Sequence, residues 1–143
     1  MEMNDLQAGK VGEYLVCADL ILKGYVAFPS EQGLPFDVVL STKDRLYKIQ
    51  VKTTRKPMSV PQRKVRTEKY LFHIRRCGKG GHKTYKDNDV DIFAIVALDT
   101  KIIGYIKAKD IKQTMFFLPE NGVPRSTLNK CKRISEYKLE YAI

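Results

Sequence analysis

The sequence of 143 residues has no run of eighteen apolar residues and only three cysteines. Because a helix needs about twenty apolar residues to cross a bilayer, no segment is expected to span a membrane. The N-terminal stretch MEMNDLQAGK lacks the charged and then apolar layout of a secretory signal. Cys17, Cys77 and Cys131 are an odd and sparse set, which indicates a reduced protein. We therefore expect a cytoplasmic protein.

Acidic residues are scarce in one quarter of the chain. Residues 52–86 hold twelve Lys and Arg but only one acid, Glu68, whereas the whole chain has a net charge of +10. The rest of the chain is therefore close to neutral. A concentrated basic surface attracts polyanions, and nucleic acid is the commonest of them. The other reading is a solvated basic loop that serves solubility.

An amphipathic helix is predicted over residues 5–23, with Asn4 or Asp5 as its cap and Gly24 at its end. Glu13 lies at the border of the buried face of this helix, where an ionised carboxylate needs a partner. The apolar row at helical spacing comprises Val11, Leu15, Ala18 and Leu22.

The rest of the chain predicts a mixed α/β layer fold within one domain. Residues 91–98, DIFAIVAL, are typical of a central strand buried on both faces, and residues 102–108 are its expected hairpin partner. Residues 77–89 are rich in glycine and polar residues and are expected to form an exposed loop. The other expected elements are strands at 25–28, 70–76 and 115–118, a hairpin within 35–54, and short helices at 109–114 and 125–132.

The hairpin within residues 35–54 carries polar residues in an otherwise apolar body. If its turn centres on residues 43 and 44, Asp37 faces Gln50 with Cβ atoms about 5 Å apart. Lys52 lies two residues further along the same face, while the residues between point to the core. Oxygen ligands at this separation suit a hard cation such as Mg²⁺, and the adjacent ammonium can polarise a water.

Glu13 can supply a third oxygen if the helix packs across the sheet. A metal, an activated water and a cation near the scissile phosphate make a phosphodiester hydrolase site. The alternative is structural: Asp37 accepts backbone N–H bonds at the start of a strand, with Lys52 as its exposed ion pair. The pattern alone leaves both readings open.

Other motifs favour no further site. GKGG lacks the spacing of a phosphate-binding Walker loop. His73, Cys77, His82 and Cys131 do not have a recurrent zinc-ligand spacing. His73 alone is more often a sheet-face residue than a catalyst, although it could lie near the scissile phosphate.

Glu13, Asp37 and the triplet Gln50-Val51-Lys52 resemble the PD-(D/E)XK nuclease superfamily, and the resemblance covers roughly residues 8–110. The segment GEYLVCADLILKGY is similar to the first helix of archaeal-type Holliday junction resolvases. Glutamine stands where most members have a second acid. The group I intron-associated homing endonucleases are similar in this respect, and also in the run Val90-Asp91-Ile92-Phe93.

The resemblance implies a restriction-endonuclease-like core, with an N-terminal helix packed on a mixed central β-sheet. It implies Mg²⁺, replaceable by Mn²⁺, held by Asp37, Gln50 and Glu13, with Lys52 orienting the attacking water. The implied activity is site-specific, homing-type cleavage of double-stranded DNA. A structure-specific Holliday junction resolvase and a catalytically inactive nucleic-acid-binding module are the alternatives. Because cutting both strands requires two sites, a homodimer or homotetramer is expected.

The basic segment is then a DNA-contacting insertion, at about 55–88, of a single nuclease domain over residues 1–143. Phosphate contacts give affinity and register, and arginine is the side chain best shaped to read guanine edges. The expected DNA contacts are Arg55, Lys56, Arg63, Lys64, Arg66, His73, Arg75, Arg76 and Lys79.

Overall fold

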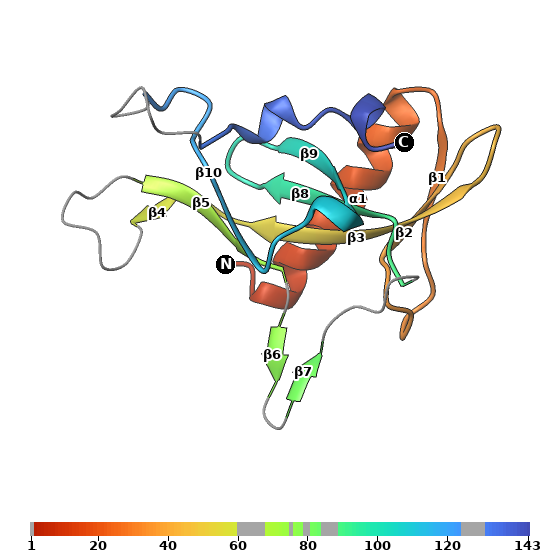
Figure 1. The fold of residues 1–143 in the computed structure, drawn as a ribbon, viewed down its shortest axis with the longest axis horizontal. Helices are drawn as coiled ribbons and strands as arrows, with labels where there is room; N and C mark the ends of the chain where they lie inside the picture. Colours follow the sequence, from red (N-terminus) through yellow and green to blue (C-terminus); the bar gives the residue numbers. More distant parts are fainter. Residues whose placement is uncertain (1, 60–67, 75, 79–80, 84–88, 124–130) are drawn as a thin grey trace.

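A mixed five-stranded sheet is the centre of the structure, a computed structural model that describes residues 2–59, 68–74, 76–78, 81–83, 89–123 and 131–143 (Figure 1). The order across the sheet is β1, β2, β3, β8, β9. β3 and β8 run parallel, and the other neighbouring pairs are antiparallel. The strands are β1 (Val26–Pro29), β2 (Val38–Ser41), β3 (Leu46–Thr54), β8 (Ile92–Ala97) and β9 (Ile102–Lys107).

Helix α1 (Asp5–Leu22) packs on one face of this sheet, against β1 and β3. Its N-terminus is capped as expected: the Asn4 side chain accepts the Gln7 N–H at 2.8 Å, and the Gln7 side chain accepts the Asn4 N–H at 3.0 Å. The chain leaves the helix through Gly24, whose φ of +91° is a conformation that favours glycine. The predicted helix at residues 5–23 is therefore confirmed to within one residue at its C-terminal end.

The buried face of α1 differs from the predicted one. The expected apolar row was wrong: Leu22 is 87% exposed and Val11 is 37% exposed, Ala18 is exposed, and Leu15 is only partly buried. The residues of α1 that are buried are Ala8, Gly12, Val16, Cys17 and Leu20. Alanine and glycine add little hydrophobicity to a row, so the pattern favoured the larger side chains beside it.

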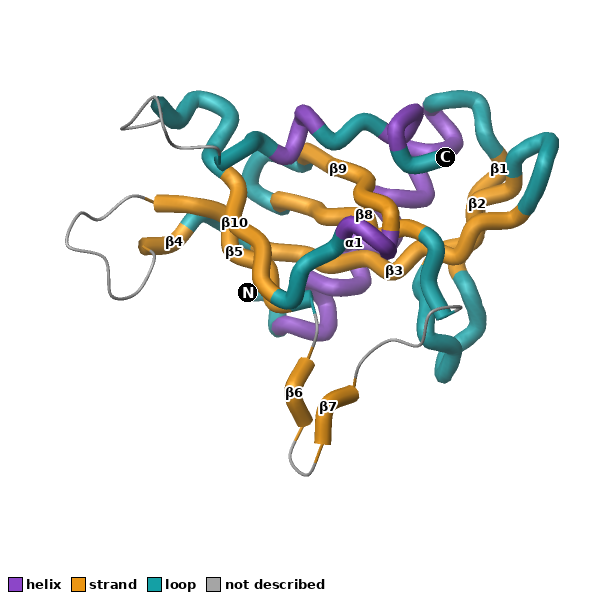
Figure 2. Tube along the Cα trace, in the orientation of Figure 1, coloured by secondary structure: helices purple, strands orange, loops and turns teal. Residues whose placement is uncertain are grey.

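The central sheet buries apolar side chains on both faces, as predicted from residues 91–98. All six residues of β8 are buried, and β9 is its antiparallel partner. One core lies between the sheet and α1. The other lies against a three-stranded sheet in the order β10 (Thr114–Phe117), β5 (Glu68–His73), β4 (Met58–Ser59) (Figure 2).

The expected loop at residues 77–89 is partly a β-ribbon. β6 (Arg76–Gly78) pairs antiparallel with β7 (Gly81–Lys83). Gly78 is the partner of Gly81, so two of the glycines that indicated a loop are paired in the ribbon. The prediction of an unpaired loop was therefore wrong for these two segments.

The C-terminal part follows the predictions less closely. Residues 109–114 form no α-helix, because the single helical turn η1 (Ala108–Asp110) ends where Ile111 becomes extended and enters the second core. Residues 124–130, which make up most of the expected helix at 125–132, lie outside the described residues. The chain finishes in two short turns, η2 (Ile134–Glu136) and η3 (Leu139–Tyr141). In the described part of the chain no helix is long and apolar enough to cross a membrane.

The backbone of α1 lies close to β3 at Gly12. A Cβ atom added at Gly12 would lie 2.0 Å from Oγ1 of Thr53 and 3.1 Å from its Cβ atom. A Cβ atom added at Gly9 would meet no heavy atom within 4 Å. Glycine inside a helix costs about 0.5–1 kcal/mol relative to alanine. Packing therefore requires glycine at position 12 but not at position 9.

We expect Gly12→Ala to lower the free energy of unfolding by about 2 kcal/mol, because α1 and β3 must move apart to admit the new methyl group. Gly9→Ala is the matched control on the same helix, and it should raise the free energy of unfolding by about 0.5–1 kcal/mol. Urea unfolding followed by circular dichroism measures both changes. Equal effects of the two substitutions would contradict the packing described for Gly12.

Candidate active site

The register of β2 and β3 places Asp37 beside Gln50. The observed pairing is the predicted one; for example, Val39 pairs with Lys48. β2 begins one residue after Asp37, but the backbone N–H of Asp37 still donates to the Ile49 carbonyl at 2.8 Å. The ladder between the two strands therefore extends to the carboxylate.

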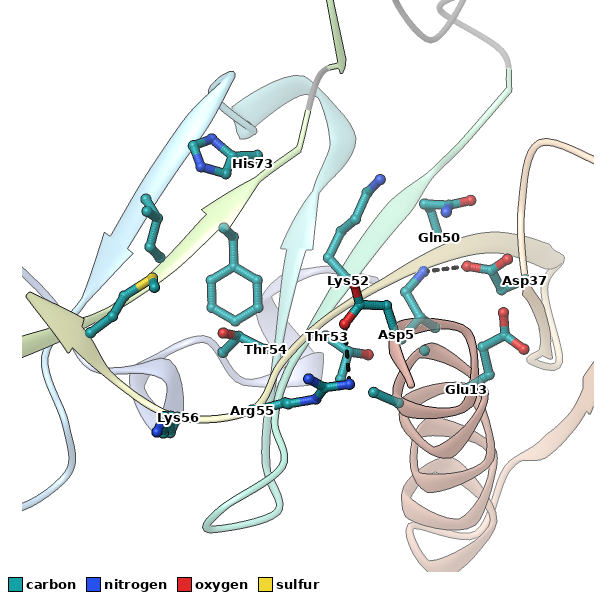
Figure 3. Close-up of a pocket in the computed structure, with 16 residues that line it drawn as sticks. Asp5, Glu13, Asp37, Gln50, Lys52, Thr53, Thr54, Arg55, Lys56 and His73 are labelled. Atoms are coloured by element: carbon teal, nitrogen blue, oxygen red, sulfur yellow. Dashed lines mark hydrogen bonds and ion pairs between the residues drawn. The ribbon is translucent and has the colours of Figure 1, made fainter. Parts of the chain in front are cut away.

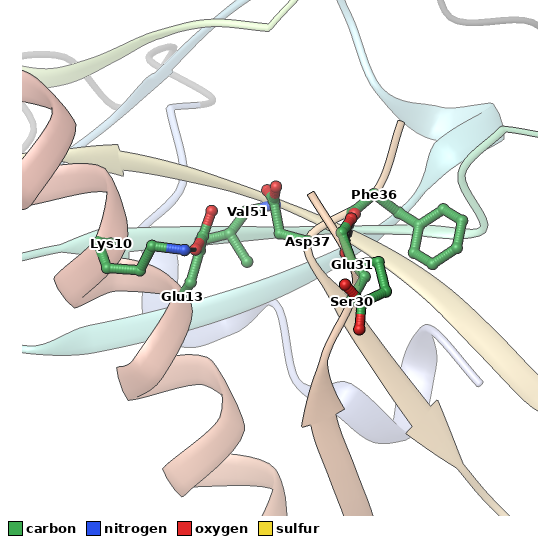
Figure 4. A network of polar contacts seen from close by, with 7 residues as sticks. All are labelled: Lys10, Glu13, Ser30, Glu31, Phe36, Asp37 and Val51. Carbon is green, nitrogen blue, oxygen red and sulfur yellow. Dashed lines mark hydrogen bonds and ion pairs between the residues drawn. The ribbon is translucent and has the colours of Figure 1, made fainter. Parts of the chain in front are cut away.

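The carboxylate of Asp37 is itself tied to β3. Its Oδ2 atom accepts the N–H of Val51 at 2.9 Å (Figure 4). Val51 is buried in the core under α1, and it lines a cleft together with Asp37, Gln50 and Lys52. Asp37 can therefore accept a backbone hydrogen bond and still be a candidate metal ligand, because the hydrogen bond orients a carboxylate that faces the cleft.

Helix α1 brings a second carboxylate to Asp37. Glu13 follows Gly12, and its side chain is 21% exposed and forms an ion pair with Lys10 at 2.9 Å. Figure 3 shows the Glu13 carboxylate pointing toward Asp37. Lys10 was not predicted as part of the site, although a lysine three residues before a glutamate on one helix is a detectable pairing signal.

The two carboxylates influence each other. Burial raises the pKa of Asp37 to about 6, and the charge of Glu13 acts in the same direction. The hydrogen bond from Val51 and the charge of Lys52 lower the pKa of Asp37 but do not offset the burial. An acid pair held in this way gains from a bound cation, which would favour the ionised form of both groups.

The cleft has a volume of about 620 Å³ and contains all four predicted catalytic residues, Glu13, Asp37, Gln50 and Lys52 (Figure 3). The N-terminal half of α1 forms one side, and the end of β3 with β4 and β5 forms the other. The lining also includes Thr53 and Thr54, which the sequence did not single out. A cleft with acidic, amide and amine groups at one point suits hydrolysis of a phosphodiester.

A family model described as PD-(D/E)XK endonuclease matches residues 3–139. The chain belongs to this family. Its fold is similar to that of a bacterial homing endonuclease, I-Ssp6803I, with a TM-score of 0.67 and 14% sequence identity over 97% of this chain and 91% of that one. No curated protein sequence is significantly similar to the chain. The suspected superfamily and the restriction-endonuclease-like fold are therefore confirmed.

The described part of this PD-(D/E)XK chain contains three of the expected DNA contacts with their side chains. Arg55, Lys56 and His73 line the cleft. Arg55 is also bound at the start of α1, with its Nη2 atom 2.8 Å from the Met3 carbonyl and 3.1 Å from Asp5. Arg63, Lys64, Arg66, Arg75 and Lys79 lie outside the described residues, and Arg76 is described only by its backbone in β6.

Members of the PD-(D/E)XK family generally use divalent metals such as Mg²⁺. The residues described here include no group of three or more His, Cys, Asp and Glu that could hold a metal. The available set is instead two carboxylates, from Glu13 and Asp37, with the amide of Gln50 in the same cleft. All three are oxygen donors, which hard cations prefer, and the raised pKa of Asp37 marks a place where a cation is favourable. Glu13, Asp37 and Gln50 therefore suit an ion such as Mg²⁺, although they supply one negative charge fewer than three carboxylates would.

The raised pKa of Asp37 predicts a pH-dependent loss of stability in metal-free protein. Between the ordinary pKa of 3.8 and about 6, the folded state holds a proton that the unfolded state has released, so stability falls as pH rises through this window. Asp37→Asn keeps an acceptor for Val51 but cannot ionise. We expect it to be more stable than wild type by about 1 kcal/mol at pH 8, a value reduced for partial exposure, and nearly equal to wild type at pH 4.

Thermal unfolding in a chelator at both pH values measures the difference. Glu13→Gln is the companion variant. It should lower the pKa of Asp37, because one cause of the raised value is removed, and should therefore narrow the pH range over which stability falls. A stability difference between Asp37→Asn and wild type that stays constant from pH 4 to pH 8 would contradict the raised pKa of Asp37.

Proposed function

We propose that this PD-(D/E)XK protein is a Mg²⁺-dependent endonuclease that hydrolyses double-stranded DNA at specific sites, as a homing-type enzyme. The observation that carries the proposal is the convergence of Glu13, Asp37, Gln50 and Lys52 in one cleft. The similarity in fold to a bacterial homing endonuclease supports the homing type over other branches of the family.

Each residue has a role that follows from its chemistry. Asp37 and Glu13 would hold the metal ion together with the amide oxygen of Gln50. When bound there, the ion would supply a water of lowered pKa and would neutralise phosphate charge. Lys52 orients the attacking water and stabilises the extra negative charge of the pentavalent phosphate. The water oxygen forms a bond to phosphorus and releases its proton to solvent. The bond to the leaving oxygen breaks, and that oxygen takes up a proton from solvent.

Gln50 makes the metal site weaker in charge than a site with three acids. An amide oxygen ligates a hard cation but does not balance its charge, so affinity depends more strongly on Glu13 and Asp37. Because the pKa of Asp37 is about 6, protons compete with the metal below that pH. The proposed enzyme should therefore lose activity as the pH falls, and a higher Mg²⁺ concentration should offset part of that loss.

DNA contacts are assigned to the basic segment. Arg55 and Lys56 extend the cleft beyond β3, and the segment at about 55–88 is proposed as an insertion that holds the duplex. Cutting both strands calls for two sites, and we propose a homodimer or homotetramer. A cytoplasmic location, together with the DNA, is part of the same proposal.

The metal site can be tested with two substitutions of opposite expected effect. Asp37→Ala should reduce cleavage at least about a thousandfold, because one of the two anionic ligands is lost. Gln50→Glu should keep Mn²⁺ binding or tighten it by about tenfold, because it adds an anion to the donor set. Gln32→Glu, at an exposed position outside the cleft, is the control for the added charge. Calorimetry of Mn²⁺ binding and a cleavage assay are the measurements, and full cleavage by Asp37→Ala would remove the site.

The substrate and the reaction can be tested separately. We expect nicking of supercoiled plasmid in Mg²⁺ or Mn²⁺ and not in chelator, and preference for linear duplex over a labelled four-way junction. Preference for the junction would favour the resolvase alternative. Salt-sensitive DNA binding with no metal-dependent nicking would favour the inactive binding module, for which the missing acid at position 50 is the specific argument.

A further inference from the structure

Two glycines lie inside α1, and only one has a packing reason. Gly12 is held against Thr53, where a side chain has no room. Gly9 has no heavy atom within 4 Å of its added Cβ position and lies in a regular part of the helix. Because a helix is destabilised by an interior glycine, the residue at position 9 is unfavourable for folding without a packing benefit in return.

Gly9 forms part of the wall of the cleft, and the absence of a side chain leaves open space there. Gly9 is half-buried and lines the cleft that contains Asp37 and Lys52. The nearest acids of α1 on either side of it are already paired, Asp5 with Arg55 at 3.1 Å and Glu13 with Lys10 at 2.9 Å. Gly9 therefore stands between two ion pairs on the helix wall, with room for a close approach from the cleft.

The side of the cleft away from α1 has the opposite character. Lys52 comes from β3, Lys56 from the segment after β3 and His73 from β5 (Figure 3). All three line the cleft that Gly9 also lines. The lysines on this side can position a phosphate chain, while the helix backbone on the other side limits how deeply the chain enters the cleft. Glycine is the residue that permits the closest approach of a ligand to a backbone.

We infer that the α1 backbone at Gly9 is a contact surface for the sugar–phosphate backbone of the DNA, and that Gly9 is a positioning residue which sets the depth of the scissile phosphate relative to Asp37 and Lys52. This inference rests on the proposed endonuclease function. A side chain at position 9 stabilises the helix and moves the phosphate away from the reacting groups.

A size series at position 9 tests the inference. We expect Gly9→Ala and Gly9→Leu to keep or raise the melting temperature and to leave Mn²⁺ binding unchanged. Gly9→Leu should weaken binding of a labelled duplex of mixed sequence by about tenfold and cleavage by about a hundredfold, with Gly9→Ala between it and wild type. Because no charge is removed, the slope of log Kd against log salt should equal that of wild type, whereas Lys56→Ala should reduce the slope by about 0.9.

Ala18→Leu is the matched control, since it adds a similar side chain to an exposed position of the same helix outside the cleft. It should leave duplex binding and cleavage unchanged. Wild-type affinity in Gly9→Leu would overturn the inference, and so would a loss of duplex affinity accompanied by a lower melting temperature or weaker Mn²⁺ binding. If wild-type protein binds no DNA, the proposed function itself fails; if it binds DNA and the size series has no effect, only the role of Gly9 fails.

Discussion

The hydrogen bond from the Val51 N–H to Asp37 is the contact on which the candidate site depends. It joins an acid in the loop before β2 to the strand that carries Gln50 and Lys52. The side chain of Val51 is packed under α1, so the donor cannot shift without disturbing the core. Rigid secondary structure thereby fixes the direction of a carboxylate that lies outside any strand.

Asp37 lies in an environment that is unfavourable for its negative charge. Asp37 is buried enough to hold a proton near pH 6, and Glu13 adds repulsion rather than relief. Two acids placed in this way lower the stability of the metal-free fold. Such a loss of stability is typical of functional sites that bind a cation. Gln50 adds no negative charge to the cleft, whereas a third carboxylate at this position would increase the repulsion between the acids.

Much of this site could be predicted from the sequence, because strand alternation and a short turn determine which residues of a hairpin face each other. The pairing of Val39 with Lys48 and the burial of β8 follow from local patterns. The contact face of α1 could not be predicted in this way. It depends on how closely Gly12 approaches Thr53, and that fit is a property of two elements together. The link between Arg55 and the start of α1 joins residues far apart in the chain, and no local pattern indicates it.

The parallel pairing of β3 with β8 has a consequence for the order in which the chain acquires its structure. These strands are neighbours in the sheet, yet the whole basic segment separates them in sequence. Bringing the ends of so long a connection together has an entropic cost that must be met before the central ladder can form. Helix α1 and the β2–β3 and β8–β9 hairpins involve only short closures. The rate-limiting step of folding should therefore be the docking of the part that carries α1, β2 and β3 with the part that carries β8 and β9.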